Sequence, residues 1–324
     1  MPRSSLVKTA WLALVLTAVV LVTLLRKDAQ AAAHEYVPAM RAAGVRIVQL
    51  SDGKQGLADA SGHVTPLVHY KRIASGSTVA DDLLLNLAEP ERIAALTDYG
   101  KSSSTEAYRY GQRPTLPGQH RIERLKELGI DLLILNHLGA PAELARMREA
   151  GIQVFDLGEM RGLVTLLPNM EAVATLLGER ERGAKLVAKL TRRLAAVASD
   201  IPSRGRKRAL YVAAYGGQIF TGATRSSYHD VLLAAGLEDA ATGKFRDYAQ
   251  LDPEQLLELD PDLVVTQKSS DAAFCRISGL AALRACQAGA KGVLGIDDAL
   301  IGSPGLGMLD AAEQLRDRAY GQRQ

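Results

Sequence analysis

A ten-residue pattern that occurs twice constrains the fold of this chain more than any other feature of its sequence. The pattern E-x-L-x-E-L-x-x-D-L runs from Glu123 to Leu132 and again from Glu254 to Leu263. In both copies the spacing of leucine and glutamate is typical of a short helix, and the closing Asp-Leu begins an apolar run typical of a buried strand. A helix that leads into a parallel strand is half of a βαβ unit, so the repeat predicts two similar α/β lobes. The competing interpretation is that leucine-rich amphipathic helices resemble one another by chance.

The length and charge of the chain limit its function classes. Its 324 residues suit two domains, because a single hydrophobic core rarely grows beyond roughly 250 to 300 residues. The formal net charge is +3. The segment before residue 32 contributes these charged residues: Arg3, Lys8, Arg26, Lys27 and Asp28. The remainder is therefore close to neutral, which removes the main electrostatic argument for nucleic-acid binding.

The N-terminal segment, residues 1–33, predicts export. Basic residues precede a mostly apolar run from Ala10 to Leu25, and Ala29-Gln30-Ala31 places small residues at the spacing of a signal-peptide cleavage site. The apolar run is shorter than the about 20 residues that span a bilayer, which favours a cleaved signal peptide. Arg26-Lys27 directly after the run instead resembles the flank of a retained membrane anchor. With either form, we expect the folded part to be periplasmic.

Strand and helix patterns alternate on both sides of one long helical segment. Apolar runs begin near Ile73, Ile93, Leu132 and Ile152, with helical patterns between them, and this alternation predicts a parallel sheet flanked by helices. The alternation restarts at Ala209. Each half of the chain is therefore expected to form its own α/β lobe.

The helical segment divides the chain into parts. We expect a small hairpin and an N-terminal α/β lobe over residues 34–168, an inter-lobe helix over 169–201 and a C-terminal α/β lobe over 202–324, with a ligand cleft between the lobes. The helix from Glu179 to Asp200 would reach across a small domain and brace both lobes. Residues 98–119 are expected to form a polar loop.

Two cysteines, Cys275 and Cys286, limit the redox and metal chemistry. An oxidising compartment allows them to form a disulfide across a short loop, and free buried thiols are the alternative. A structural zinc or iron–sulfur site needs about four ligands, and the chain has no Cys-x-x-Cys. We expect no resident metal and no cofactor.

Several stretches, taken in order, resemble one family. Residues 58–65, 71–75 and 91–97 are similar to the family's first hairpin and its first two strands, and residues 251–265 to its most recognisable C-terminal stretch. The family is the cobalamin- and siderophore-type periplasmic substrate-binding proteins of ABC importers, and the resemblance covers most of the chain after the N-terminal segment. It implies two Rossmann-like lobes joined by a single long helix, no catalytic step, and a monomer that delivers its ligand to a permease of the inner membrane.

The resemblance also gives the repeat a role. In the family a glutamate on each lobe docks against arginines of the permease, and the matching positions here are Glu123 and Glu254. Carboxylates on pseudo-equivalent helices suit a two-fold partner, and plain solvated glutamates are the alternative. The first copy has Gly129-Ile130-Asp131 where the second has Asp260-Pro261-Asp262, so Glu123 is the weaker match.

Ligands of open α/β sheets bind beyond the carboxyl ends of the strands, which selects loops on both lobes. Tyrosine and cationic side chains in these loops suit a large, flat or anionic ligand, so they predict a metal chelate such as a ferric siderophore, cobalamin or haem. The candidate contacts are Ser75, Ser77, Tyr99, Tyr108, Arg109, Tyr110, His137, Tyr215, Arg246, Tyr248 and Lys268. His137 is also a candidate axial ligand to haem iron, with a satisfied loop histidine as the alternative.

Two other function classes remain as alternatives. An exported Rossmann-like enzyme is one, but the sequence contains no G-x-G-x-x-G, G-x-x-x-x-G-K-[ST], G-x-S-x-G or H-E-x-x-H pattern. A membrane-tethered sensor or structural protein is the other, and a retained N-terminal anchor would favour it. We expect a substrate-binding protein and not an enzyme.

Overall fold

The computed structural model describes residues 46–104, 106–117, 122–136, 141–199, 205–216, 218–301 and 305–321. The expected targeting segment, residues 1–33, and the candidate ligand His137 lie outside these ranges. Among the helices of the described ranges, none combines the length and the apolar character that a membrane span requires.

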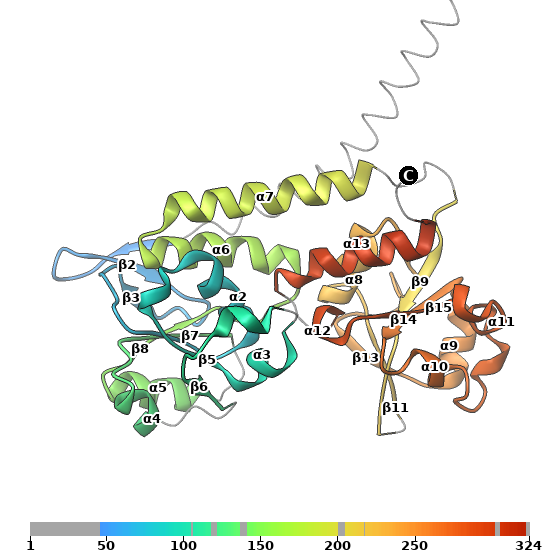
Figure 1. Cartoon of the computed structure of the whole chain (residues 1–324), viewed down its shortest axis with the longest axis horizontal. Helices are drawn as coiled ribbons and strands as arrows, with labels where there is room; N and C mark the ends of the chain where they lie inside the picture. Colours follow the sequence, from blue (N-terminus) through green and yellow to red (C-terminus); the bar gives the residue numbers. More distant parts are fainter. Residues whose placement is uncertain are drawn as a thin grey trace, which may run out of the picture.

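A five-stranded parallel sheet with the order β6-β5-β4-β7-β8 forms the N-terminal lobe (Figure 1). All residues of β7 are buried, as expected for a central strand with helices on both faces. The strands are β4 (Ile73–Ser75), β5 (Ile93–Thr97), β6 (Thr115–Leu116), β7 (Leu132–Leu135) and β8 (Gln153–Asp156). The helices are α2 (Thr78–Leu87), η1 (Pro90–Arg92), α3 (Asp98–Ser103), η2 (Ala107–Tyr110), α4 (Ile122–Glu127) and α5 (Pro141–Glu149).

The segment 98–119 is not the expected polar loop, because it contains α3, η2 and β6. Thr97 caps α3 by accepting a hydrogen bond from the Gly100 N–H at 2.9 Å. Helix α3 is only six residues long, too short to show an apolar period in the sequence. The expectation of a loop over residues 98–119 was therefore wrong, because α3 depends on its cap and not on an apolar period.

The expected hairpin before the lobe is a small antiparallel sheet of β1 (Ile47–Gln49), β2 (Gln55–Ala58) and β3 (Val64–Pro66). Its anchor is Asp59, whose side chain is buried. The Asp59 carboxylate pairs with Arg148 at 2.9 Å and accepts the N–H of Asp156 at 3.2 Å. These bonds tie the hairpin to the edge of the large sheet.

The C-terminal lobe combines a parallel sheet with an antiparallel one. The parallel order is β12-β9-β14-β15 and the antiparallel order is β10-β11-β13. The strands are β9 (Arg208–Tyr211), β10 (Ala213–Tyr215), β11 (Gln218–Gly222), β12 (Glu238–Asp239), β13 (Tyr248–Leu251), β14 (Leu263–Gln267) and β15 (Val293–Ile296). The helices are α8 (Ser227–Ala234), α9 (Pro253–Leu259), α10 (Asp271–Phe274), η3 (Leu280–Ala282), α11 (Arg284–Gln287), η4 (Gly289–Lys291), α12 (Asp298–Ile301) and α13 (Gly307–Tyr320). A disulfide joins Cys275 to Cys286.

The two copies of the repeat occupy matching places in the two lobes. Each copy is a short helix, α4 or α9, followed by a buried strand, β7 or β14. The aspartate of each copy fixes the start of the neighbouring strand, because Asp131 accepts the Arg72 N–H at 3.0 Å and Asp262 accepts the Arg208 N–H at 2.9 Å. The expectation of two α/β lobes is confirmed.

Two helices that pack against each other follow the N-terminal sheet, α6 (Leu163–Leu177) and α7 (Arg180–Ser199), and α7, with 20 residues, is the long helix expected to bridge the lobes. They lie side by side, with α6 over the N-terminal lobe and α7 extending from there toward the C-terminal lobe (Figure 1). Helix α6 begins at Leu163, six residues before the expected Asn169, and Pro168 lies inside it. Gly178 ends α6 in the left-handed conformation, with φ of 80°, and allows the turn into α7.

The C-terminal lobe supplies the cap at the start of α6. The Asp230 carboxylate of α8 accepts the Leu163 N–H at 2.7 Å, whereas the residue at the N-cap, Gly162, has no side chain to do so. At the other end of the bridge, Arg193 of α7 pairs with Asp310 and Glu313 of α13. Polar contacts therefore fix both helices to the C-terminal lobe.

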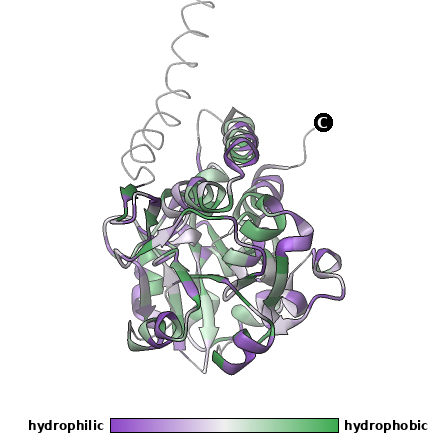
Figure 2. Cartoon of the chain, turned by 90° about the vertical axis from the view of Figure 1, so that its left-hand side faces the viewer, coloured by the Kyte–Doolittle hydropathy of each residue, from purple (hydrophilic) through white to green (hydrophobic). Residues whose placement is uncertain are grey.

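One hydrophobic core runs through both lobes. It includes Leu83 of α2, Met170 of α6, Val231 of α8 and Leu309 of α13, all buried. Two smaller cores fill the outer faces of the two sheets. Seen along the long axis, hydrophobic residues gather on the inner strands and hydrophilic residues on the outer helix turns (Figure 2). The lobes therefore share a core and are not two independently packed bodies.

The Asp230 cap predicts a pH dependence of stability. Burial raises the pKa of Asp230 to about 6 from an ordinary value of 3.8, so the folded protein binds this proton more tightly than the unfolded chain. This contribution is present below pH 4 and is lost as the pH rises through 6. Between pH 4 and 7 the free energy of unfolding should fall by roughly 2 to 3 kcal/mol more in the wild type than in Asp230→Asn.

Urea denaturation at the two pH values measures this difference. Glu171→Gln on the exposed side of α6 is the control, and it should keep the wild-type pH dependence. Identical pH dependence in the wild type and Asp230→Asn would contradict the burial of the Asp230 carboxyl group at this position.

Candidate ligand-binding cleft

Three tyrosines of the C-terminal lobe form a stacked cluster at the ends of its strands. The rings of Tyr211 and Tyr228 are nearly parallel, with 3.6 Å between centroids and 9° between planes. Tyr248 meets Tyr228 edge to face at 5.9 Å. Tyr211 ends β9, Tyr228 lies in the first turn of α8 and Tyr248 begins β13. The cluster thus lies where ligands of α/β sheets bind.

Four tyrosine rings are unusually exposed. The exposed fractions are 71% for Tyr99, 79% for Tyr108, 56% for Tyr215 and 57% for Tyr248. The hydroxyl of Tyr215 donates to Gln267 Oε1 at 3.1 Å, which orients its ring at the end of β10. Exposed aromatic rings mark ligand surfaces more often than exposed polar groups do. All four belong to the set predicted from the sequence.

The tyrosines of the two lobes face each other closely enough to interact. Burial raises the pKa of Tyr228, and the phenols of Tyr248, Tyr215 and Tyr99 raise it further. Tyr99 belongs to α3 of the N-terminal lobe, whereas the other three belong to the C-terminal lobe. Tyr99 therefore lies near the C-terminal tyrosines at the boundary between the lobes, which makes this boundary the candidate cleft and the two sets of rings its candidate walls.

Cationic side chains lie beside the aromatic wall. Arg246 and Lys268 are exposed, as expected for ligand contacts. Arg225 pairs with Asp247 at 3.4 Å, and both residues have positive φ, 77° and 55°. Non-glycine residues in this conformation carry strain and concentrate at functional sites.

Sequence reasoning missed part of this wall. The hydrogen bond to Glu159 raises the pKa of Arg161, and the charge of Asp247 contributes to the same effect. Arg161 therefore lies near Asp247. Tyr211, Tyr228 and Arg225 were also not predicted. Tyr228 could have been predicted from the sequence, because it directly follows the N-cap pattern Ser226-Ser227 at the start of a helix that comes after a strand.

Four predicted contact residues are used inside the N-terminal lobe. Ser75 and Ser77 are buried, and Ser77 caps α2 by accepting the Ala80 N–H at 3.2 Å. Tyr110 is buried too. Arg109 pairs with Glu106 at 2.6 Å and donates to the Leu85 carbonyl at 2.5 Å. These four side chains are therefore buried or bonded within the N-terminal lobe, where they stabilise the loops.

A buried carboxylate fixes the helix that carries Tyr99. Asp81 of α2 is fully buried and accepts hydrogen bonds from the Thr97 N–H at 3.1 Å, the Thr97 hydroxyl and the Tyr110 hydroxyl at 3.0 Å. Burial raises the pKa of Asp81, and these hydrogen bonds counteract that effect. Gly100 packs directly on these three groups. The start of α3, and with it Tyr99, is thereby held at the edge of the cleft.

Within the described ranges, no group of three or more histidine, cysteine, aspartate or glutamate side chains is arranged to hold a metal ion. The cleft instead offers aromatic faces, phenol oxygens and cations. Such a surface suits a large planar or anionic molecule that brings its own metal.

Comparisons with known proteins agree with this geometry. The sequence model of the periplasmic binding protein family matches residues 73–316. A cobalamin-binding protein of Halobacterium salinarum is 24% identical over 216 residues, which cover 65% of this chain and 58% of that protein. The chain thus spans a little over half of the length of this relative.

Solved structures share the fold. A periplasmic binding protein of Veillonella parvula superposes with a TM-score of 0.71 at 16% identity, covering 86% of this chain and 99% of that one. The periplasmic haem-binding protein HutB of Vibrio cholerae gives 0.67 at 22% identity, covering 78% and 99%. The haem-binding protein RhuT of Roseiflexus sp. RS-1 gives 0.65 at 21% identity, covering 77% and 99%.

The packing around Gly100 predicts that this position accepts no side chain. A Cβ at this position would collide with the Asp81 carboxylate, the Tyr110 hydroxyl and the Thr97 hydroxyl. Gly100→Ala should lower the free energy of unfolding by roughly 1 to 3 kcal/mol, measured by urea denaturation. Gly307→Ala is the matched control, because a Cβ there meets only ordinary contacts. Equal stability of the two variants would contradict the described packing.

Proposed function

We infer the function from one premise: this chain belongs to the periplasmic binding protein family. We propose that it captures a metal chelate between its lobes, outside the cytosol, and delivers it to the permease of an ABC importer. The chelate is a ferric siderophore, cobalamin or haem. The family and the solved neighbours are binding proteins, and we propose that this chain carries out no catalytic step.

The observation that carries the proposal is the set of exposed tyrosines that both lobes present at their boundary, the two candidate walls. Tyr99 lies on one wall, and Tyr215 and Tyr248 lie on the other. Aromatic rings on opposite walls suit a flat macrocycle, because each ring face stacks on an apolar surface. The nearby Arg246 and Lys268 supply partners for carboxylates or phosphates at the rim of such a ligand. The names of the relatives, cobalamin-binding and haem-binding, indicate the same class of ligand.

The phenols also offer direct iron ligation. A tyrosine oxygen is a known axial ligand of haem iron, and the exposed Tyr215 and Tyr248 are the candidates on the C-terminal wall. A phenol has an ordinary pKa of about 10 and is neutral at pH 7, so Tyr248 would release a proton on binding ferric iron. His137 remains a proposed second axial ligand from the N-terminal lobe.

The repeat supports the proposed permease contact. Glu123 and Glu254 are both exposed, in the first turns of α4 and α9, at matching places in the two lobes. A capping box between Asp252 and Gln255 fixes the start of α9 beside Glu254. Two anionic points on pseudo-equivalent helices suit a permease with two-fold symmetry.

The cleft predicts that single tyrosine truncations weaken chelate binding. Titration of the wild type with haemin, cyanocobalamin and ferric siderophores, monitored by absorbance or by calorimetry, should identify a ligand. Tyr215→Ala and Tyr248→Ala should each raise Kd about five- to tenfold, because each removes a ring contact of about 1 kcal/mol.

Tyr320→Phe is the control for this experiment, because Tyr320 closes α13 and donates to the Gly236 carbonyl, outside the tyrosine walls. Its Kd should equal that of the wild type. Failure of every chelate to bind the wild type, or unchanged affinity in both alanine variants, would contradict the proposed function.

The docking glutamates predict a separation of binding from transport. The double variant Glu123→Ala/Glu254→Ala should keep the wild-type Kd and lose uptake of the chelate by cells that depend on this protein. Glu91→Ala, at another exposed glutamate of the N-terminal lobe, should keep both. Full uptake by the double variant would show that the permease contact lies elsewhere.

A further inference from the structure

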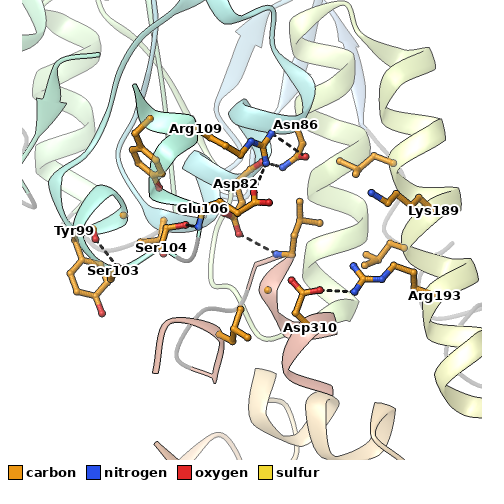
Figure 3. A pocket seen from close by; sticks show the side chains of 18 residues that line it. Asp82, Asn86, Tyr99, Ser103, Ser104, Glu106, Arg109, Lys189, Arg193 and Asp310 are labelled. Atoms are coloured by element: carbon orange, nitrogen blue, oxygen red, sulfur yellow. Dashed lines mark hydrogen bonds and ion pairs between the residues drawn. The ribbon is translucent and has the colours of Figure 1, made fainter. Parts of the chain in front are cut away.

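A cavity lies on the helical side of the molecule, between α2, α3 and η2 of the N-terminal lobe, the bridging helix α7 and α13 of the C-terminal lobe (Figure 3). Its volume is about 190 Å³. Tyr99 lies at its edge, so the cavity adjoins the cleft. The charged and amide side chains that line it include Asp82, Asn86, Glu106, Lys189, Arg193 and Asp310.

The size of this cavity favours an occupant smaller than the chelate. Pockets for drug-sized ligands measure roughly 300 to 1,000 Å³, and a tetrapyrrole needs at least that space. A volume of about 190 Å³ corresponds to roughly six waters at about 30 Å³ each. The cavity therefore suits a molecule of a few heavy atoms. The charged side chains in its lining favour a charged occupant.

One wall presents a carboxylate without a cationic partner. Asp82 of α2 accepts the Leu306 N–H at 3.2 Å and makes no ion pair with a residue of the described ranges. Burial raises the pKa of Asp82 to about 7, and the neighbouring Asp81 and Glu106 add to this effect. Arg109 offsets it only in part, because its guanidinium is already paired with Glu106. A bound cation would stabilise the ionised form of Asp82.

The opposite wall presents an ammonium group without an anionic partner. Lys189 lies one turn before Arg193 on α7, and Figure 3 shows its amine pointing into the cavity. Arg193 is held by Asp310 at 2.5 Å and by Glu313 at 2.7 Å, whereas Lys189 pairs with no residue of the described part of the chain. A bound carboxylate would give Lys189 the partner that the protein does not supply.

We propose that this cavity binds a small zwitterion, whose ammonium group pairs with Asp82 and whose carboxylate pairs with Lys189. A monoanion would leave Asp82 without a partner, and a monocation would leave Lys189 without one. The cavity joins elements of both lobes, since α2 belongs to one and α13 to the other. An occupant therefore contacts both lobes at once, at a site that adjoins the candidate chelate cleft at Tyr99.

Calorimetric titration of the wild-type chain with glycine, β-alanine and γ-aminobutyrate tests the site, because these probes differ in the separation of their charges. At least one should bind, and acetate and methylamine should bind at least about tenfold more weakly. Binding at pH 7 should release protons, because the ammonium group stabilises ionised Asp82. The released protons appear as a dependence of the measured heat on the ionisation enthalpy of the buffer.

Substitutions connect the binding to the cavity. Asp82→Asn and Lys189→Gln should each weaken the zwitterion at least about tenfold, and Asp82→Asn should abolish the proton release. Lys185→Gln is the matched control, because Lys185 lies one turn earlier on α7 and pairs with Glu181 at the surface. It should bind as the wild type does.

Three results would overturn the proposal: no binding of any zwitterion at about 10 mM, acetate binding as tightly as the best zwitterion, or an unchanged Kd in both cavity variants. Circular dichroism of each variant excludes a loss of fold as the cause of weaker binding. The substituted residues, Asp82 and Lys189, are not among the proposed chelate contacts, so failure of this test is distinguishable from failure of the proposed function.

Discussion

The apolar core that runs through both lobes is the constraint on which the rest of the structure depends. Buried side chains of α2, α6, α8 and α13 pack together in it, so neither lobe can swing away without exposing apolar surface at about 25 cal/mol per Å². The Asp230 cap and the Arg193 ion pairs fix the bridging helices at the C-terminal end of this core. We therefore expect ligand binding to close the cleft only slightly.

This fixed frame determines which tyrosines are available to a ligand. The hydrogen bonds of buried Asp81 hold the start of α3 and so place Tyr99 on one wall. On the other wall, the stack of Tyr211 on Tyr228 supports Tyr248. Because the scaffold orders both walls before a ligand arrives, little conformational entropy remains to be lost on binding.

The sequence predicts the lobes well, and the roles of individual side chains less well, for a physical reason. The repeat, the buried parallel strands and the loops at their ends follow from local period and composition. Burial of Tyr110 and the pairing of Arg109 with Glu106 depend on which neighbours the fold brings close, and no local pattern encodes that. The antiparallel sheet of β10, β11 and β13 was missed because short strands around Tyr215-Gly216 read as a loop. Sequence alone therefore selects candidate loops for the cleft but does not separate exposed side chains from those that hold the loops in place.

The most direct test of ligand capture between two braced lobes is a crystal structure of the chain with the chelate that it binds most tightly. We predict that the chelate lies between Tyr99 on one side and Tyr215 and Tyr248 on the other. The two lobes should keep their relative placement to within about 1 Å of the unliganded chain, as in preorganised binding proteins. A chelate bound outside these walls, or a wide rotation of one lobe about α6 and α7, would contradict this view of the protein.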